Sequence, residues 1–211
     1  MKIIKEGCYK GTRIILGNRK SDYLEDCRQF LIEDGYDQIT FPTINFADTF
    51  KDKVGEENNN MMFEVKDRSD RELCLPPEYT ALVQQLTNTE FRNKKDVKLF
   101  YIQECFRGEK PQRGRYRQFT QLGVEVINPT EKTTIESLAI LANELIRLFN
   151  KAGSGEFETD FDVSRGLDYY DDGKGFEITC PQLGTSKQIC GGGKYEGGIG
   201  FAIGIDRLLT L

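Results

Sequence analysis

The chain has 211 residues, of which 38% are hydrophobic and 30% are charged, and its formal net charge is −5. This composition supplies enough apolar surface for a buried core, while no run is long and apolar enough to cross a bilayer. The charged N-terminal residues do not resemble a signal peptide. We therefore expect a single cytoplasmic domain over residues 1–211, and not a protein that coats nucleic acids, although a local basic site is compatible with the net charge.

The sequence contains no histidine. This excludes Ser-His-Asp and Cys-His nucleophilic catalysis, histidine-ligated metals and imidazole acid–base chemistry. The remaining polar residue types suit phosphate chemistry, in which catalysis rests on positioning and charge stabilisation. The six cysteines form no Cys-x-x-Cys pair, so we expect buried free thiols in place of disulfides or a zinc site.

The apolar pattern predicts strands alternating with helices. In chain order, the predicted elements are a helix at 21–33, strands at 38–41, 62–65 and 72–75, a helix opening at Pro77, strands at 97–106 and ending at 124–127, a helix at 134–149, strands at 157–163 and 176–180, and a helix at 201–211. The polar segment 47–60 predicts a loop. Because strands outnumber helices and most connections resemble hairpins, we predict an α+β fold with an antiparallel sheet flanked by helices.

The connection 106–117, with the sequence FRGEKPQRGRYR, contains five basic residues and one acid. Several converging arginines can hold a polyphosphate through bidentate hydrogen bonds. A solvated, charged hairpin tip explains the same composition, and composition alone does not decide between the two interpretations.

Two further segments are open to more than one interpretation. The glycine-rich segment 191–198 matches neither nucleotide-binding glycine motif, so it indicates either close approach of a ligand to the backbone or a flexible turn between a strand and a helix. Segment 164–170 places a cation, a carboxylate and two phenols together, either for binding or as the polar end of a strand. Arg207 lies in an apolar run and needs a partner, for which Asp206 and Glu196 are the local candidates.

Taken together, these segments resemble the catalytic domain of the histidyl-tRNA synthetase family, a class II aminoacyl-tRNA synthetase. The matching segments are about 35–50 for motif 1, with Pro42 at the class II proline, 75–81 for the LRPEGTA segment, about 100–127 for motif 2, 164–170 (SRGLDYY) and 190–197 (CGGGKYEG) for the two histidine motifs, and about 200–211 for motif 3. The motifs occur in order along nearly the whole chain.

The resemblance implies a class II synthetase-like antiparallel sheet, ATP with Mg²⁺, histidine in an adjoining pocket and a homodimer formed through motif 1. It assigns catalytic roles to Arg165, Arg107 and Arg207, and ATP binding to Arg107, Glu109, Arg115 and Arg207. It assigns histidine binding to Glu78, Thr80, Gln121, Glu125, Arg165, Tyr169, Tyr170 and Tyr195. It assigns the tRNA acceptor end to Lys110, Gln112, Arg113 and Arg117, and no metal ligands to protein side chains.

The expected side-chain pocket is the most discriminating part of the resemblance. An imidazole has two polar nitrogens, and burying either one unpaired is costly. Glu125 and Tyr170 match the family's imidazole-binding positions and can satisfy both nitrogens, with Tyr195 closing the pocket. Pro76 and Tyr79 depart from the family's arginine and glycine, so we expect altered access around the amino acid.

The resemblance implies that the protein activates histidine with ATP and transfers it to tRNA(His), as a histidine–tRNA ligase. No segment matches the family's anticodon-binding domain, and the insertion domain is reduced to one helix and a Gly-rich link. Transfer is therefore the less secure step, and a non-tRNA acceptor is an alternative.

Two functions outside the ligase reaction are compatible with the same motifs. One is a non-catalytic, histidine-sensing subunit resembling the regulatory paralogue of ATP phosphoribosyltransferase, and the second is a structural module that binds nucleotides or tRNA. Retention of the full catalytic arginine set argues against the regulatory subunit, and its members are Arg107, Arg115, Arg165 and Arg207.

Overall fold

A computed structural model of the protein describes most of the chain. The described residues are 2–3, 13–15, 17–51, 53–55, 59–110, 114–149, 156–163, 170–183 and 187–211, with the backbone alone for 2–3, 13–14 and 170–173. Within these residues, no helix is long and apolar enough to span a membrane.

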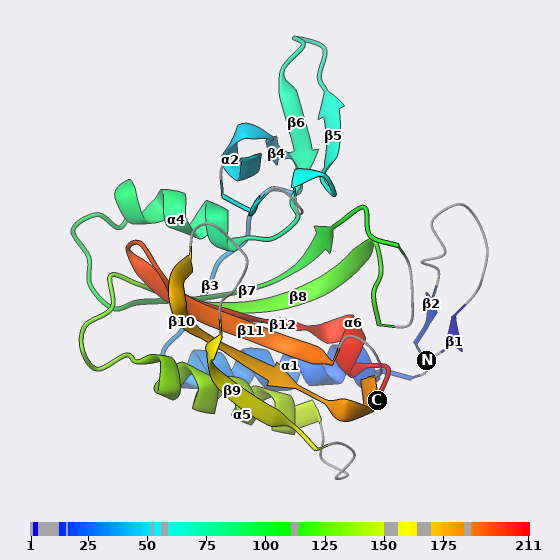
Figure 1. The fold of residues 1–211 in the computed structure, drawn as a ribbon, viewed down its shortest axis with the longest axis vertical. Helices are drawn as coiled ribbons and strands as arrows, with labels where there is room; N and C mark the ends of the chain where they lie inside the picture. Colours follow the sequence, from blue (N-terminus) through cyan, green and yellow to red (C-terminus); the bar gives the residue numbers. More distant parts are fainter. Residues whose placement is uncertain are drawn as a thin grey trace.

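A seven-stranded sheet forms the centre of the fold (Figure 1). Its strands, in spatial order, are β3 (Asp37–Gln38), β7 (Val97–Phe106), β8 (Gln118–Ile127), β12 (Gly198–Gly204), β11 (Gln188–Tyr195), β10 (Tyr170–Thr179) and β9 (Glu158–Val163). Every neighbouring pair is antiparallel except β3 and β7, which are parallel. The predicted α+β fold is therefore confirmed.

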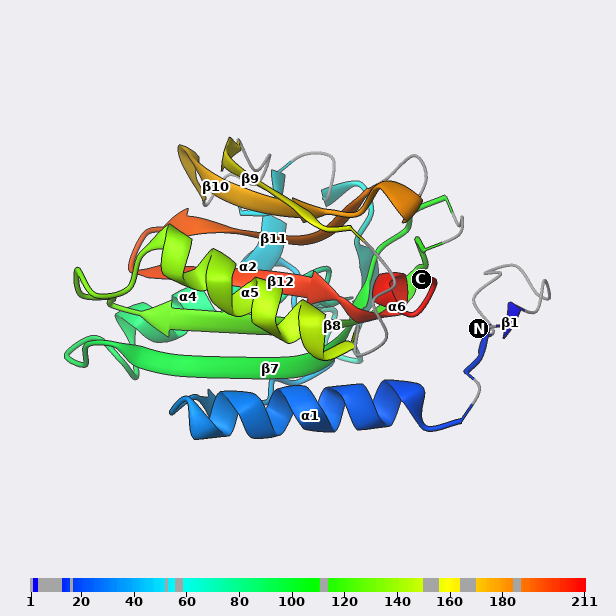
Figure 2. The ribbon, with the colours of Figure 1, turned by 90° about the horizontal axis from the view of Figure 1, so that it is seen from below.

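Two long helices, α1 (Arg19–Glu33) and α5 (Ile135–Phe149), cover one face of this sheet (Figure 2). The leucines of α5 and the apolar face of α1 pack on alternate sheet residues, of which Val124, Phe201 and Ile178 are buried. Alternation along each strand sends the intervening residues to the opposite face. The main core therefore lies on the helix side and leaves the other face available for a site.

The opposite face carries α4 (Thr80–Asn88) and a small second sheet (Figure 1). That three-stranded sheet has the order β4 (Asn45–Phe46), β6 (Glu72–Leu75) and β5 (Phe63–Lys66), with α2 (Asp48–Lys51) beside it. A second cluster of buried residues, including Tyr79, Tyr101 and Phe50, joins these elements to the main sheet. The remaining elements are the pair β1 (Lys2–Ile3) and β2 (Arg13–Ile14), the 3-10 turn η1 (Pro181–Leu183) and α6 (Ile205–Leu208).

Several sequence-based boundaries are wrong for identifiable reasons. The strand expected at 38–41 shortens to β3 because the backbone of Phe41 hydrogen-bonds the Gln103 side chain at 2.7 and 2.8 Å. The loop expected at 47–60 contains α2, whose Phe50 is fully buried. The helix expected to open at Pro77 begins at Thr80.

The most consequential error concerns residues 201–211, for which the sequence predicts a helix. Residues 201–204 belong to strand β12, which pairs with β8 on one side and β11 on the other. Only 205–208 form a helix. A central strand is buried on both faces, so it lacks the alternation that marks a strand in the sequence. The glycine-rich segment before it is also strand β11 and not a flexible turn.

The cysteine prediction can be checked for five of the six residues. Cys27, Cys74, Cys105, Cys180 and Cys190 are all buried and free. The expectation of buried thiols is confirmed for these, and Cys8 lies outside the described residues.

Candidate active site

Small residues line the middle of the sheet face that looks toward α4. Glu125, Gly200, Gly193 and Gly175 lie opposite one another across β8, β12, β11 and β10. The neighbouring row is Gly123, Ala202, Gly191 and Glu177. We call the glycines and alanine of these two rows the small-residue floor. It leaves the backbone of three adjacent strands open to close approach by a flat ligand or a side chain.

Glu125 occupies one end of the small-residue floor and is 1% exposed. Its carboxyl group accepts hydrogen bonds from the Thr80 and Tyr195 hydroxyls, each at 2.9 Å. A methyl group at Gly200 would lie 1.8 Å from Glu125 Oε2, so this glycine provides the space that the carboxyl group fills. The fold therefore holds one buried acid between two hydroxyls from different elements.

Burial raises the pKa of Glu125 from 4.5 to about 8. The hydrogen bonds from Thr80 and Tyr195 favour the ionised form and oppose this shift, while the nearby Glu78 carboxylate adds to it. A carboxyl group with this pKa is mainly protonated at neutral pH. A ligand that brings a positive charge or an N–H donor would restore the carboxylate.

Glu78 is also buried, at 4% exposure. Its contacts indicate that it stabilises the start of a helix. Its two carboxylate oxygens accept hydrogen bonds from the backbone N–H groups of Thr80 at 2.6 Å and Ala81 at 3.0 Å. These amides are unsatisfied donors at the start of α4, where a carboxylate is stabilising. Glu78 therefore fixes the start of α4, which positions Thr80 beside Glu125.

The basic connection between β7 and β8 begins and ends with paired backbone groups, because Arg107 N–H donates to the Arg117 carbonyl at 2.9 Å. Arg107 Nε donates to the Pro77 carbonyl at 2.8 Å, and its guanidinium lies 5.3 Å from the Phe119 ring centre. Arg115 pairs with Glu109 at 3.0 Å. At the base of the connection, Arg107 and Arg115 are therefore held by neighbours, while residues 111–113 lie outside the described residues.

Arg207, on α6, reaches back to this hairpin. Its Nε donates to the Gly114 carbonyl at 3.1 Å, and a second nitrogen donates to the Gln188 carbonyl. Burial lowers the pKa of Arg207, and the positive charges of Arg115 and Arg107 lower it further, against the opposing effect of Glu109. Three of the predicted arginines therefore lie close enough to repel one another, which is the electrostatic condition of an anion site.

Asp206, expected as a local partner of Arg207, has different contacts. Its carboxylate accepts from the Thr120 backbone N–H at 2.5 Å and from Lys20 Nζ at 3.4 Å. It therefore ties α6 to β8 and α1, and leaves Arg207 directed toward the hairpin. Sequence reasoning did not identify this anchoring role, because the partners are more than 80 residues away.

Comparison with known proteins identifies the family of the chain. A model of the histidyl-tRNA synthetase family matches residues 18–150. The chain belongs to the histidyl-tRNA synthetase family. A histidine–tRNA ligase of Methanosarcina acetivorans is 26% identical over 96% of the chain and 74% of its own length. A histidine–tRNA ligase of Methanococcus maripaludis is 34% identical over 74% of the chain, but this alignment spans only 37% of that protein.

Solved structures agree on the class II synthetase fold. Apo histidyl-tRNA synthetase from S. aureus superposes with a TM-score of 0.68 at 24% identity, covering 95% of this chain and 68% of that one. A Bacillus halodurans structure described as an ATP phosphoribosyltransferase regulatory subunit/histidyl-tRNA synthetase gives a TM-score of 0.76 at 16% identity, covering 100% and 84%. At these identities the likeness establishes the fold alone.

Residues that the family resemblance assigned fall into three groups. The structure brings together Thr80, Glu125 and Tyr195, and it brings together Arg107, Glu109, Arg115 and Arg207. Gln121 lies on the same strand face as Glu125 and accepts a hydrogen bond from the Cys105 thiol at 3.1 Å. Lys110 is exposed, and Arg117 Nε donates to the Glu109 carbonyl at 3.1 Å. Arg165, Tyr169, Gln112, Arg113 and the Tyr170 side chain lie outside what the structure describes.

The two departures from the family pattern, Pro76 and Tyr79, are both buried. The Tyr79 ring stacks on Phe41 with centres 5.6 Å apart, and its hydroxyl donates to the Glu104 carbonyl at 2.9 Å. Tyr79 thus packs in the second core, with its hydroxyl bonded to the backbone of β7. The carbonyls of Pro76 and Pro77 accept from Phe106 N–H and Arg107 Nε, which joins this segment to the start of the hairpin.

Proposed function

We propose that this protein activates histidine with ATP, forming histidyl-adenylate and pyrophosphate, and transfers the histidyl group to tRNA(His). The observation that supports this proposal best is the buried Glu125, held between Thr80 and Tyr195 on the same sheet face as the arginine cluster. Family membership supports the reaction, and the pairing of a buried acid with an arginine cluster supports histidine and ATP as its substrates.

Glu125 is suited to an imidazole because it offers a buried acceptor that needs a polar partner. An imidazole N–H would donate to the carboxylate, and an imidazolium would also neutralise it. An apolar side chain of similar size would leave the acid unpaired, which is a strong basis for rejecting it. Within the small-residue floor, Gly200 gives the Glu125 carboxyl group its room and Gly123 accommodates the Tyr101 ring.

In the activation step, a carboxylate oxygen of histidine attacks the α-phosphorus of ATP and the bond to pyrophosphate breaks. Arg107 would contact the α-phosphate, and Arg115 and Arg207 would hold the β- and γ-phosphates. Their guanidinium groups stabilise charge that moves onto the leaving pyrophosphate. Arg165, which the resemblance assigns to the attacked phosphate, would contribute from the segment after β9.

Mg²⁺ is expected to bind with the nucleotide. Among the described residues, no group of three or more Cys, Asp and Glu side chains is placed to hold a metal ion. Mg²⁺ commonly keeps several waters and binds largely through substrate phosphates. When bound, it would neutralise charge on those phosphates.

The acceptor step rests on the exposed side of the same hairpin. Lys110 is exposed there, and Arg117 is partly so, which leaves positive charge available to the acceptor end of tRNA(His). Gln112 and Arg113 belong to the same segment. We also propose that two copies of the chain associate through the region 35–50, in which Ile44 and Phe46 are 58% and 56% exposed.

Histidine-dependent exchange between ATP and pyrophosphate tests the proposal directly. We expect exchange that requires histidine and Mg²⁺ and that falls at least tenfold in Arg207→Ala, since one charge-assisted contact to phosphate is worth about 1.5–3 kcal/mol. Absence of exchange from the folded protein at saturating histidine would exclude the enzyme. Arg165→Ala with unchanged exchange would exclude that residue's assigned role. Charging of a tRNA(His) transcript then tests the acceptor, against a small amine or carrier protein as the alternative.

A histidine-sensing regulatory subunit is the second candidate. The observation that favours it is that the arginines already have partners within the protein, since Arg115 pairs with Glu109 and Arg207 with two carbonyls. Such a protein would bind histidine at Glu125 without supporting exchange. Histidine binding by calorimetry, together with no exchange and association with an ATP phosphoribosyltransferase, would favour this candidate over the ligase.

A further inference from the structure

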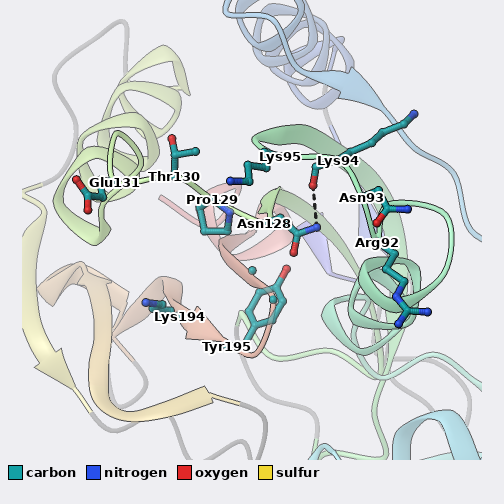
Figure 3. A pocket seen from close by; sticks show the side chains of 12 residues that line it. Arg92, Asn93, Lys94, Lys95, Asn128, Pro129, Thr130, Glu131, Lys194 and Tyr195 are labelled. Carbon is teal, nitrogen blue, oxygen red and sulfur yellow. Dashed lines mark hydrogen bonds between the residues drawn. The ribbon is translucent and has the colours of Figure 1, made fainter.

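A cavity lies at the other end of the sheet, away from the arginine hairpin (Figure 3). Its volume is about 850 Å³, and three segments form its walls: 92–95, 128–131, and residues 194, 195, 197 and 198. Segment 92–95 precedes the first residue of β7, whereas the hairpin follows the last, so the length of this strand separates the two sites. The cavity has the size of a small-molecule site.

Asn128 joins all three walls. Its backbone N–H donates to the Gly197 carbonyl at 2.8 Å, and its side-chain amide donates to the Phe91 and Lys94 carbonyls, both at 2.9 Å. Figure 3 shows it at the centre of the view, with the bond to Lys94 dashed. Asn128 adopts a positive φ of 49°, which this residue type tolerates. The walls are therefore fixed relative to one another before any ligand binds.

Positive charge dominates the rim of this cavity. Arg92, Lys94, Lys95 and Lys194 line it together with a single carboxylate, Glu131, although the whole chain is negative at −5. None of these four cations forms an ion pair with a carboxylate in the part of the chain that the structure describes. An exposed cluster of unpaired cations in a net acidic protein repels itself unless an anion is present.

The neighbouring acid, Asp96, offsets only part of this positive charge, because its hydrogen bonds are made to Thr130. Asp96 accepts from the Thr130 backbone N–H at 2.7 Å and from the Thr130 hydroxyl at 3.0 Å. These hydrogen bonds hold the pKa of Asp96 below its usual range, with the backbone bond the largest cause, and the positive charges of Lys132 and Lys95 lower it further. The carboxylate thus stabilises the loop 128–131 and offsets part of the Lys95 charge, while the rim keeps a net positive charge.

We propose that this cavity binds an anion that carries two or more phosphate groups. The cations come from separate walls: in Figure 3, Lys95 extends toward Pro129, Arg92 extends from the opposite side of the cavity, and Lys194 lies across from both. Cations that come from separate connections fit an anion whose charge is spread over linked phosphates better than one that carries a single phosphate. Lysine and arginine both bind phosphate oxygens through charge-assisted hydrogen bonds. A free polyphosphate compound and the backbone of an RNA strand share this chemistry.

The cavity also adjoins the Glu125 site without being part of it. Tyr195 lines the cavity, while its hydroxyl donates to Glu125 at 2.9 Å. The phosphate site does not depend on the proposed function, because none of its four cations belongs to the candidate active site. Its test therefore uses a local signal and not enzyme activity.

Protection of individual lysines from acylation, followed by mass spectrometry of the intact folded protein, provides that signal. Inorganic tripolyphosphate and a short single-stranded RNA are the two probes. We expect Lys94, Lys95 and Lys194 to react several-fold more slowly with a probe present, while Lys66, exposed on the β5–β6 hairpin, reacts unchanged. Protection by tripolyphosphate would show that a free polyphosphate is enough to occupy the cavity. Protection by RNA alone would show that the bound phosphate groups belong to an RNA backbone. Protection by neither probe overturns the proposal.

A pair of variants with equal charge separates the site from general electrostatics. In Lys95→Ala/Lys194→Ala, protection of Lys94 should require at least about tenfold more of the effective probe, because two charge-assisted contacts are lost. The control, Lys66→Ala/Arg71→Ala, removes the same charge from the β5–β6 hairpin, which does not line the cavity, and should leave the requirement unchanged. Equal behaviour of the two variants, both folded by circular dichroism, would assign the protection to non-specific attraction and overturn the proposal.

Discussion

At the scale of single residues, Glu125 is the most informative group, because its protonation links ligand binding to stability. Its pKa is about 8 in the folded chain and 4.5 when unperturbed. Between these values the folded state holds a proton that the unfolded state has released, so the free energy of unfolding falls as pH rises from about 4.5 to about 8. Above pH 8 both states are ionised, and this contribution no longer changes.

This linkage gives a prediction that does not require activity. Urea unfolding between pH 5.5 and 8 should show stability falling with pH in the native sequence, and a markedly flatter dependence in Glu125→Gln, which keeps the shape but cannot ionise. Added histidine should stabilise the native protein and not the variant, since the ligand restores the buried carboxylate. An identical pH dependence in both proteins would show that Glu125 is already ionised in the folded state.

At the scale of secondary-structure elements, strand β12 provides the space beside Glu125 through its glycine at position 200. Gly200→Ala would place a methyl group 1.8 Å from Glu125 Oε2, whereas Gly204→Ala on the same strand would meet nothing closer than 3.7 Å. We expect Gly200→Ala to raise the KM for histidine at least about tenfold, because displacing the acid removes a charged hydrogen bond. Gly204→Ala should change it little.

The comparison of these two variants also controls for strand propensity. Both substitutions replace a strand glycine by alanine, so any general effect on β12 is shared. Thermal unfolding of both proteins establishes whether each is folded before the KM is measured by pyrophosphate exchange. Equal KM values in Gly200→Ala and the native protein would mean that the space beside Glu125 is not needed for histidine.

Helix α5 and strand β7 follow the predicted bounds closely. Helix α5 is predictable because its apolar residues recur on one face, and β7 because it is a long apolar run, although Leu99, Phe100 and Tyr101 bury both of its faces. For strand β12 the sequence predicts a helix, because its run of apolar and glycine residues has no period of two. The motif positions of the arginines are predictable, but the reasons for Gly200 and Asp206 depend on contacts between distant segments.

At the scale of the whole molecule, the two faces of the main sheet pack against different elements. Helices α1 and α5 bury one face, and the other carries the small-residue floor, α4 and the three-stranded sheet (Figures 1 and 2). The two ends of the strands differ as well, with the arginine hairpin at one end and the cavity around Asn128 at the other. This arrangement leaves the three-stranded sheet as the part of the fold without an assigned chemical role.

One face of that sheet is apolar and exposed. Phe46, Leu73 and Val65 lie opposite one another across β4, β6 and β5, and Phe46 and Val65 are 56% and 49% exposed. The other face is closed, since Cys74 is buried and Lys51 pairs with Glu72 at 2.6 Å. An exposed apolar face on a short sheet is a typical association surface. Phe46 itself belongs to the region 35–50 through which we propose that two copies associate.

Phe46→Asp should therefore convert the proposed homodimer into monomers, because a carboxylate would be buried without a partner in the interface. Sedimentation velocity over a range of concentrations measures this against a monomer mass of 24.1 kDa. Phe161→Asp is the matched control: Phe161 is 46% exposed on the edge strand β9, at the opposite edge of the main sheet, and its change should leave the dimer intact. Dissociation in both variants would indicate general destabilisation, and a native protein that is monomeric at every concentration would exclude the interface.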